Sequence, residues 1–196
     1  SLDLVGREPC RPCDAQRGGI SIGEAAGFAL LERPQQAASH SGVALLGYGE
    51  SSDAYHMSTP HPEGVGAALA MQRALARAAL APAAIDYINM HGTASQVNDS
   101  MEDRAITTVF GTQTACSSTK GWTGHALGAA GITEAVIAAL CIQNGIRPGC
   151  LNARSIDPSF TSKVLLTNQS GVVQRVLSNS FGFGGSNCSL IFGAHP

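Results

Sequence analysis

Apolar positions fall into two kinds of run along the chain, and the two kinds predict different elements. Apolar residues recur at helical spacing over residues 67–80, 98–110 and 125–143. Shorter apolar or alternating runs predict strands over residues 19–31, 43–47, 85–90, 114–117, 164–167, 172–178 and 187–192. The stretches 48–62 and 146–162 contain glycine, serine and proline and are expected to be loops. Strands that alternate with helices, with further strands at the end, predict an α/β fold with a mixed sheet.

The predicted helix boundaries rest on a few residues. Pro82 is expected to end the first helix and Gly145 the third. Asn98 and Asp99 are expected to cap the second helix, because an acidic first turn suits the helix macrodipole. The third helix is expected to begin at His125.

Two histidines lie at the ends of predicted elements, in glycine-rich and nearly uncharged surroundings. His91 follows the strand 85–90, and the carboxyl end of a parallel strand is where α/β folds place ligands. His125 would lie at a helix N-terminus, whose positive end disfavours the imidazolium form. Two neutral imidazoles that donate N–H groups would polarise a carbonyl oxygen. The sequence therefore predicts a polarising pocket, although it shows no obvious nucleophile to accompany it.

Size and composition point to a chain that is partly covered by other protein. The 196 residues suit one domain or one half of a larger duplicated fold. Charged residues make up 13% of the chain, against about 25% in ordinary globular domains. A surface normally covered by more protein would explain the low charge; the alternative is a bland surface rich in glycine and alanine. The first residue is Ser1, which favours a start inside a longer gene product or after a cleaved tag.

Charge and hydropathy narrow the function classes. The net charge is −2 and no basic stripe is visible, so nucleic-acid binding is not expected. The longest apolar stretch, residues 135–142, is short of the roughly 20 residues that a membrane span needs, and no signal peptide is visible. We therefore expect a cytoplasmic protein without membrane contact.

The six cysteines are expected to be reduced and mostly buried thiols, because they are scattered through apolar or loop contexts. They are Cys10, Cys13, Cys116, Cys141, Cys150 and Cys188. The pair Cys10 and Cys13 has the spacing of half a zinc site, but no second pair stands at ligand spacing. No cofactor is expected.

Lys120 and the glycine-rich turn 181–185 complete the chemistry that the residues suggest. Lys120 lies in an apolar, glycine-rich setting and is expected to be partly buried, so it needs an acidic partner. Glu102 and Glu134 are the candidates, although Glu102 could simply be solvated in a first helical turn. The turn 181–185 (FGFGG) lacks the lysine of a phosphate-binding loop. We expect it to aim a backbone N–H at an oxyanion, with a phenyl ring as a movable wall.

Four motifs carry a resemblance to a known family. They are residues 8–27 (EPCRPCDAQRGGISIGEAAG), 91–95 (HGTAS), 118–131 (STKGWTGHALGAAG) and 179–187 (NSFGFGGSN). Together they resemble the β-ketoacyl-acyl carrier protein synthases, of the elongating Cys-His-His type. That family has a thiolase-like fold, two similar α/β halves packed as five layers, αβαβα. The chain resembles the C-terminal half only, so residues 1–196 are expected to be one domain that lacks the N-terminal half with the nucleophilic cysteine.

The resemblance implies a decarboxylative Claisen condensation between an acyl-enzyme and malonyl-acyl carrier protein, in fatty acid biosynthesis. His91 and His125 match the two catalytic histidines, and Lys120 matches the supporting lysine, with Glu134 as its partner. Phe183 matches the gatekeeping phenylalanine whose N–H completes the oxyanion hole. The partners implied are acyl carrier protein with phosphopantetheine-linked substrates and the missing half, and the full-length protein would be a homodimer. The fragment alone is expected to be inactive.

The resemblance also implies two further sets of residues. Positions that match substrate-binding residues are Thr93, Thr123, Phe181 and Gly184. Positions that hold a structural cation in some members are Asn89, Glu134, Ser178 and Asn179.

Residues 114–118 (TACSS) look like the family's nucleophile motif. The lysine motif follows at once, however, whereas a nucleophile should turn directly into a helix that lowers the thiol pKa. Cys116 is therefore expected to end a buried strand. Two alternatives stay open: a polyketide ketosynthase or its non-catalytic chain-length partner, and a self-standing thioester hydrolase or acyl-binding domain that uses Cys116 or the histidine pocket.

Overall fold

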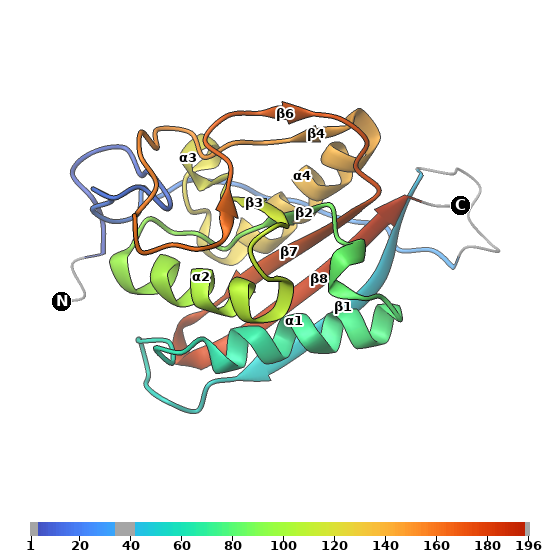
Figure 1. The fold of residues 1–196 in the computed structure, drawn as a ribbon, viewed down its shortest axis with the longest axis horizontal. Coiled ribbons are helices and arrows are strands. Elements are labelled where there is room, and N and C mark those ends of the chain that lie inside the picture. Colours follow the sequence, from blue (N-terminus) through green and yellow to red (C-terminus); the bar gives the residue numbers. More distant parts are fainter. Residues whose placement is uncertain (1–3, 34–41, 195–196) are drawn as a thin grey trace.

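One mixed sheet forms the centre of the computed structural model, which describes residues 4–33 and 42–194 (Figure 1). Its strands occur in the order β1 (Val43–Ser52), β8 (Ser186–Ala194), β7 (Arg175–Phe181), β2 (Tyr87–Asn89), β3 (Ala115–Ser117) and β5 (Lys163–Val164). The β1–β8 and β8–β7 pairs are antiparallel, whereas β7, β2, β3 and β5 run parallel. The predicted α/β class with a mixed sheet is confirmed.

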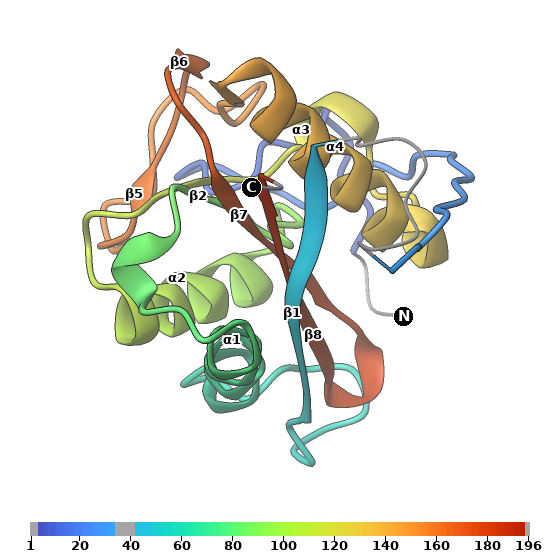
Figure 2. The same ribbon diagram turned by 90° about the vertical axis from the view of Figure 1, so that its right-hand side faces the viewer.

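Helices cover both faces of this sheet, which gives three layers (Figure 2). Helices α1 (Val65–Ala78) and α2 (Gln96–Phe110) lie on one face, and α4 (Ala130–Asn144) lies on the other. The smaller elements are α3 (Lys120–Thr123), η2 (Pro82–Ala84), η3 (Leu127–Ala129), η4 (Phe183–Gly185) and a two-stranded sheet of β4 (Ile146–Arg147) with β6 (Gln169–Ser170).

Two apolar cores correspond to the two faces. Met71, Ile88 and Leu177 belong to the core beneath α1 and α2, whereas Tyr87 and Val176 belong to the core beneath α4. Side chains of a strand alternate between faces. Successive residues of β2 and β7 therefore point to opposite helical layers. Polar side chains of these strands can meet only when they lie on the same face of the sheet.

Most predicted elements are present, but several boundaries differ. Helix α1 ends at Ala78, and Pro82 begins η2 rather than ending the helix. Residues 19–31 form no strand; only Ile20 and Ile22 make isolated bridges. Helix α2 is capped by Ser95, whose Oγ accepts the Asn98 N–H, rather than by Asn98 and Asp99. Helix α4 begins at Ala130, so His125 does not lie at its N-terminus. Two smaller differences are that β1 continues through residues 48–52 and that β4 opens the expected loop after Gly145.

An apolar surface lies on the α4 side of the molecule. Val136 and Leu140 of α4 are 48% and 50% exposed, and Phe28 and Leu30 in the extended segment 23–33 are 98% and 84% exposed. The segment 23–33 lies against α4 at Gly27, where an added Cβ would lie 2.7 Å from a side-chain carbon of Ile132. We call the set Phe28, Leu30, Leu31, Val136 and Leu140 the apolar face. Several large apolar side chains exposed on one side of a domain are typical of a surface that other protein covers.

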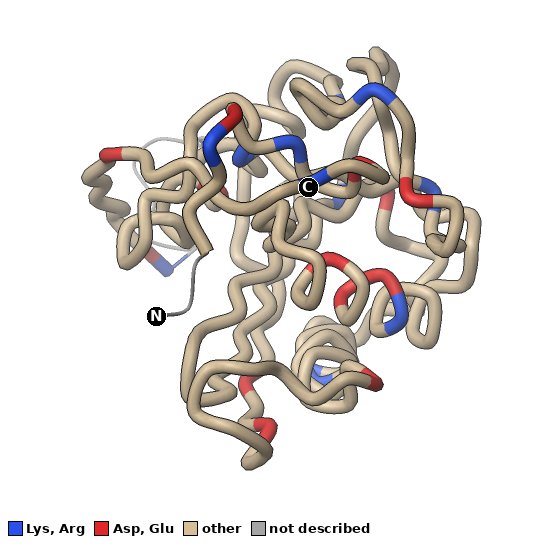
Figure 3. Tube along the Cα trace, turned by 90° about the vertical axis from the view of Figure 1, so that its left-hand side faces the viewer, with Lys and Arg blue, Asp and Glu red and all other residues tan. Residues whose placement is uncertain are grey.

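The apolar face also explains a membrane-like signal. Among the described residues, the stretch Leu127–Asn144 is long and apolar enough, by length and composition alone, to cross a membrane. Core helices of soluble proteins pass the same test. Charged residues of both signs are sparse and interspersed along the trace (Figure 3).

Close approach of α1 to β1 depends on glycine. A Cβ at Gly49 would lie 1.9 Å from the Ala70 carbonyl oxygen, and a Cβ at Gly47 would lie 2.5 Å from the Ala74 carbonyl oxygen. The neighbouring atoms are helix backbone and cannot turn aside as a side chain would. The helix therefore rests directly on the strand at these two positions.

We predict that Gly49→Ala lowers the free energy of unfolding by about 1–3 kcal/mol, because the methyl group must push α1 away from the sheet. Gly128→Ala is the control, since a Cβ there meets no atom within 4 Å. Urea unfolding of both variants measures the difference, and the control is expected to stay within about 0.5 kcal/mol of the parent. Equal losses in the two variants would contradict this account of the α1–β1 contact.

Candidate functional site

The two predicted histidines meet in one pocket. His91 follows β2 and His125 precedes η3, and their ring centroids lie 5.3 Å apart with the planes at 84°. Both line a pocket of about 1100 Å³, together with Phe181 and Phe183. The Phe181 ring lies 5.8 Å from the His91 ring. The structure therefore brings together residues that are 34 positions apart in the sequence.

Hydrogen bonds at Nδ1 set the tautomer of both rings. His125 Nδ1 accepts the Leu127 backbone N–H at 3.2 Å. His91 Nδ1 lies 3.4 Å from Lys120 Nζ, which is a donor. A neutral ring that accepts at Nδ1 carries its proton on Nε2. Each histidine therefore has a single N–H donor, at Nε2.

Lys120 is a buried charge behind His91. Its Nζ makes an ion pair with Glu134 of α4, and it also donates to the His91 carbonyl oxygen. Both side chains of the pair are nearly inaccessible to solvent. Burial raises the pKa of Glu134, and the Lys120 charge opposes that rise. Of the two candidate partners for Lys120, the structure selects Glu134.

Both imidazoles are held neutral, but the reason differs from the expected one. Burial lowers the pKa of His91 well below its ordinary value, and Lys120 and His125 add to this. Burial, followed by the Lys120 charge, lowers the pKa of His125 to about 4. The expected effect of the α4 N-terminus does not apply, because His125 lies five positions before Ala130. Desolvation and the nearby Lys120 charge keep the imidazoles neutral instead.

Glu102 fixes the loop that carries His91. Its two carboxylate oxygens accept the backbone N–H groups of His91 and Gly92, each at 2.8 Å. Asn179 donates to the same carboxylate at 3.0 Å. Burial raises the pKa of Glu102 to about 7, against these hydrogen bonds. Glu102 is therefore not the partner of Lys120; it holds the backbone of the His91 loop, a role that leaves no pattern in the sequence.

The segment around Ile22 fixes His125. The His125 N–H donates to the Ser21 carbonyl oxygen at 2.7 Å, and the Gly23 N–H donates to the His125 carbonyl oxygen at 3.1 Å. This bridge needs close backbone approach, because a Cβ at Gly23 would lie 2.2 Å from the Thr123 carbonyl oxygen. Gly23 of the motif 8–27 therefore allows the backbone contact that positions His125, a role that the predicted strand over residues 19–31 does not indicate.

A contact between two loops restrains the glycine-rich turn, on which Phe183 is 65% exposed. Asp53 Oδ1 accepts from Asn187 Nδ2 at 2.8 Å, and the Gly184 N–H donates to the Met57 carbonyl oxygen at 2.8 Å. The sequence predicts only a loop over residues 48–62, which include this stretch. Its contact with the turn makes it part of the pocket wall.

The residues matched to substrate binding do not all reach the pocket. Of the four, Thr93 and Phe181 line it. Thr123 and Gly184 are not among the described residues that line it; the Thr123 hydroxyl lies 2.8 Å from the Gly124 carbonyl oxygen. Gly184 has φ 79°, so its structural contribution is the turn itself.

The residues matched to a structural cation divide between the two faces of the sheet. Ser178 pairs with Asn89 in register, and alternation places both on the α4 face with Glu134. Buried atoms without a hydrogen-bond partner among the described residues are Asn89 Nδ2 and Glu134 Oε2. The Asn179 side chain instead bonds Glu102 and Ser189. Asn89, Ser178 and Glu134 therefore fit a shared polar site, whereas only the backbone of Asn179 could join it, and the cation stays a prediction.

Cys116 is buried within β3, as expected, and burial raises the pKa of its thiol far above the ordinary value. All six thiols are free. Cys188 is the cysteine that lines the pocket among the described residues, and burial with the nearby Glu50 raises its thiol pKa too. A thiolate is therefore disfavoured at both positions.

Comparisons with known proteins agree with this geometry. The chain matches the family model described as "Beta-ketoacyl synthase, C-terminal domain" over residues 43–154. It is 44% identical to "3-oxoacyl-acyl carrier protein synthase, mitochondrial" of Arabidopsis thaliana, over 95% of this chain and 42% of that protein. It is 43% identical to "3-oxoacyl-acyl carrier protein synthase 2" of Rhizobium meliloti, over 92% of this chain and 44% of that protein. The chain thus spans a little under half the length of these relatives.

Solved structures give the same picture. The ketosynthase ApeO, in complex with its chain length factor ApeC from Xenorhabdus doucetiae, matches with a TM-score of 0.86 and 41% identity. That match covers 99% of this chain and 48% of the ApeO–ApeC chain. The ishigamide ketosynthase/chain length factor matches with a TM-score of 0.95 and 33% identity, over 100% of this chain and 49% of that one. These neighbours confirm the thiolase-like fold class.

We predict a pH-dependent effect of Glu102→Gln on stability. The pKa of Glu102 is raised in the folded chain, so the folded state binds its proton more tightly than the unfolded state does. Its contribution to stability is therefore fully present below about pH 4.5 and is lost as the pH rises towards about 7. The free energy of unfolding of the parent, minus that of the variant, should fall by about 3 kcal/mol across this window.

Urea unfolding at a series of pH values measures this difference. Glu63→Gln is the control, because the Glu63 side chain is 68% exposed and solvent screens its charge. A parent-minus-variant difference for Glu102→Gln that does not change between pH 4.5 and 7 would contradict the assigned environment.

Proposed function

Because the chain belongs to the β-ketoacyl synthase family, whose C-terminal domain model it matches over more than half of its length, we propose that it is the C-terminal half of a 3-oxoacyl-acyl carrier protein synthase. In this proposal residues 1–196 form one domain, and an N-terminal half supplies the nucleophilic cysteine. The complete protein condenses an acyl-enzyme with malonyl-acyl carrier protein in fatty acid biosynthesis. The fragment alone is inactive.

The pair of neutral imidazoles carries the proposal. Both rings have their single N–H at Nε2 and line one pocket. Two such donors stabilise negative charge on a thioester oxygen when malonyl loses CO2. The electron pair of the broken C–C bond moves into the enolate, and the enolate carbon then attacks the acyl carbonyl. The cysteine thiolate of the other half is the leaving group.

Lys120 and Phe183 have supporting roles in this scheme. Burial, reinforced by the Lys120 charge, keeps both histidines neutral, so they remain hydrogen-bond donors rather than acids. Phe183 lies on the turn that lines the pocket and is largely exposed, which suits a movable gate whose N–H faces the oxyanion. Glu134 supports the reaction indirectly, by pairing with the buried lysine.

The missing half would cover the apolar face. Exposed Phe28, Leu30, Val136 and Leu140 lie on the side of the sheet opposite α1 and α2. A second α/β half packed there would bury α4 between two sheets and complete the five-layer arrangement that the family resemblance implies. Acyl carrier protein, homodimer formation and a cytoplasmic location belong to the same proposal; one relative's name places that relative in mitochondria.

A polyketide ketosynthase is the second candidate. The matching solved structures include ketosynthases with chain length factors, at up to 41% identity among those described above. A non-catalytic chain-length partner fits less well, because both histidines and Lys120 are present. The third reading, a self-standing thioester hydrolase, would need a reactive thiol, and Cys116 is buried with a raised pKa.

We predict that this chain becomes active when it is joined to the N-terminal half of a relative that carries the nucleophile. The fusion should decarboxylate malonyl-acyl carrier protein and condense it with an acyl donor, and His125→Ala should lower the rate by about 100-fold or more. Cys116→Ser in the same fusion is the matched control and should keep the parent rate. Short acyl donors and longer poly-β-keto donors, assayed side by side, separate the fatty acid and polyketide readings.

The chain alone provides the opposing test. We expect no thioester turnover from it. Measurable hydrolysis that Cys116→Ala abolishes would overturn the proposal in favour of a self-standing hydrolase.

A further inference from the structure

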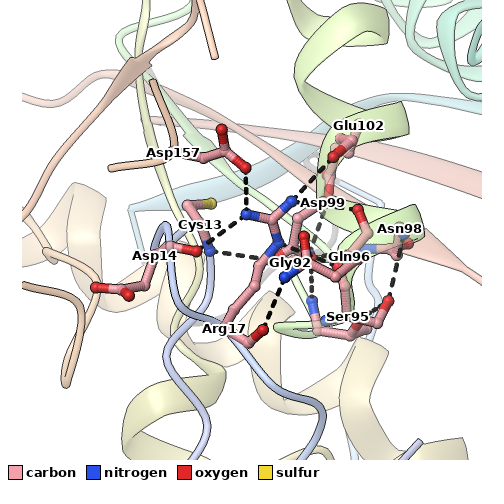
Figure 4. A network of polar contacts seen from close by, with 12 residues as sticks. Cys13, Asp14, Arg17, Gly92, Ser95, Gln96, Asn98, Asp99, Glu102 and Asp157 are labelled. Atoms are coloured by element: carbon pink, nitrogen blue, oxygen red, sulfur yellow. Dashed lines mark hydrogen bonds and ion pairs between the residues drawn. The ribbon is translucent and has the colours of Figure 1, made fainter. Parts of the chain in front are cut away.

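A buried arginine outside the pocket holds together three segments that are far apart in the sequence (Figure 4). Arg17 is 2% exposed. Its guanidinium makes an ion pair with Asp157 at 2.7 Å and another with Asp99 at 3.7 Å. It also donates to the carbonyl oxygens of Asp14, Ser95 and Gln96 and to the Ser100 hydroxyl, and it lies over the Phe160 ring, 4.9 Å from the ring centroid. The reaction scheme above gives this cluster no role.

Asp99 connects the cluster to the histidine loop. Its Oδ1 accepts the Thr93 backbone N–H at 2.9 Å, two residues after His91. Its Oδ2 accepts the Cys13 backbone N–H at 2.9 Å. The loop needs such support, because the next residue, Ala94, has φ 66°, a left-handed conformation that costs free energy for a residue with a Cβ.

The charge of Arg17 favours the ionised form of Asp99. Asp99 is completely buried, and burial raises the pKa of its carboxyl group. Hydrogen bonds from Cys13 and Asn98 and the charge of Arg17 oppose this rise. The other charged group near Asp99 is Glu102, which disfavours a second negative charge. Without Arg17 the ionised form is less favoured, and a neutral carboxyl keeps one carbonyl oxygen as a good acceptor where the carboxylate has two, so it cannot hold the Thr93 and Cys13 N–H groups equally well.

We propose that Arg17 is a positioning residue for the His91 loop: its guanidinium pairs with the Asp99 carboxylate, which accepts the Thr93 N–H and so fixes the turn that presents His91. Asp157 pairs with the same guanidinium but accepts no hydrogen bond from the described residues of the His91 loop. A variant of Asp157 therefore distinguishes loop positioning from a general loss of stability. The catalytic consequence rests on the proposed function, whereas the effect on the loop does not.

The test is the amide proton of Thr93 in the native chain, observed by NMR in four variants. In Arg17→Met and in Asp99→Asn, the Thr93 signal should move upfield and its hydrogen exchange should quicken roughly tenfold to one-hundredfold relative to β7 amides. Arg17→Lys should restore most of the parent signal, because it returns the charge. Asp157→Asn is the matched control; it should lower thermal stability and leave the Thr93 amide in place.

The outcomes are distinct. If Arg17→Met lowers stability while the Thr93 shift and exchange stay as in the parent, Arg17 is a structural residue only and the inference is wrong. If Arg17→Met does not fold, Arg17→Lys and Asp99→Asn decide, and a parent-like Thr93 amide in Asp99→Asn overturns the inference. If the Thr93 amide responds as expected but the fusion of the parent chain shows no condensation, the proposed function fails and the inference about the loop stands.

Discussion

The buried Lys120–Glu134 ion pair is the interaction on which the rest of the site depends. It joins α3, which carries the lysine, to α4 on one face of the sheet, and the lysine also donates to the His91 carbonyl oxygen. Desolvating two charges is expensive, and loss of one partner typically costs about 3–5 kcal/mol. The buried charge of Lys120 has a function at this position, because it adds to the effect of burial and lowers the pKa of both histidines further.

Backbone hydrogen bonds, rather than side-chain packing alone, then fix the pocket. Glu102 holds the N–H groups of His91 and Gly92, and a bridge to the segment around Ile22 holds His125. Asp53 holds the turn that carries Phe183 through its contact with Asn187. Each support reaches the pocket from a different segment, so the pocket forms only when the whole domain has folded. Carboxylates suit this purpose because one side chain accepts two N–H donors.

Sequence reasoning succeeded where the signal was local. The spacing of apolar residues predicted α1 and β2, and the glycine-rich context of His91 and His125 predicted a shared pocket. It failed where the determinant was remote. Residues 19–31 alternate like a strand, but a strand needs a partner, and the described chain supplies only bridges at Ile20 and Ile22. The predicted helix begins at His125, too early, because the alanine-rich run continues through η3. The spacing of apolar residues does not distinguish a 3₁₀ turn from an α-helix. Asp53, Asp99 and Arg17 were missed because side-chain contacts to distant backbone leave no periodic trace.

The central claim is that both histidines are neutral donors through Nε2, and nitrogen NMR of the chain with ¹⁵N-labelled histidine tests it most directly. At neutral pH the account predicts a protonated Nε2 and an unprotonated Nδ1 for His91 and His125 alike. A ring protonated at Nδ1, or an imidazolium at either position, would contradict the assigned roles of Lys120 and of the Leu127 N–H, and with them the polarising pocket.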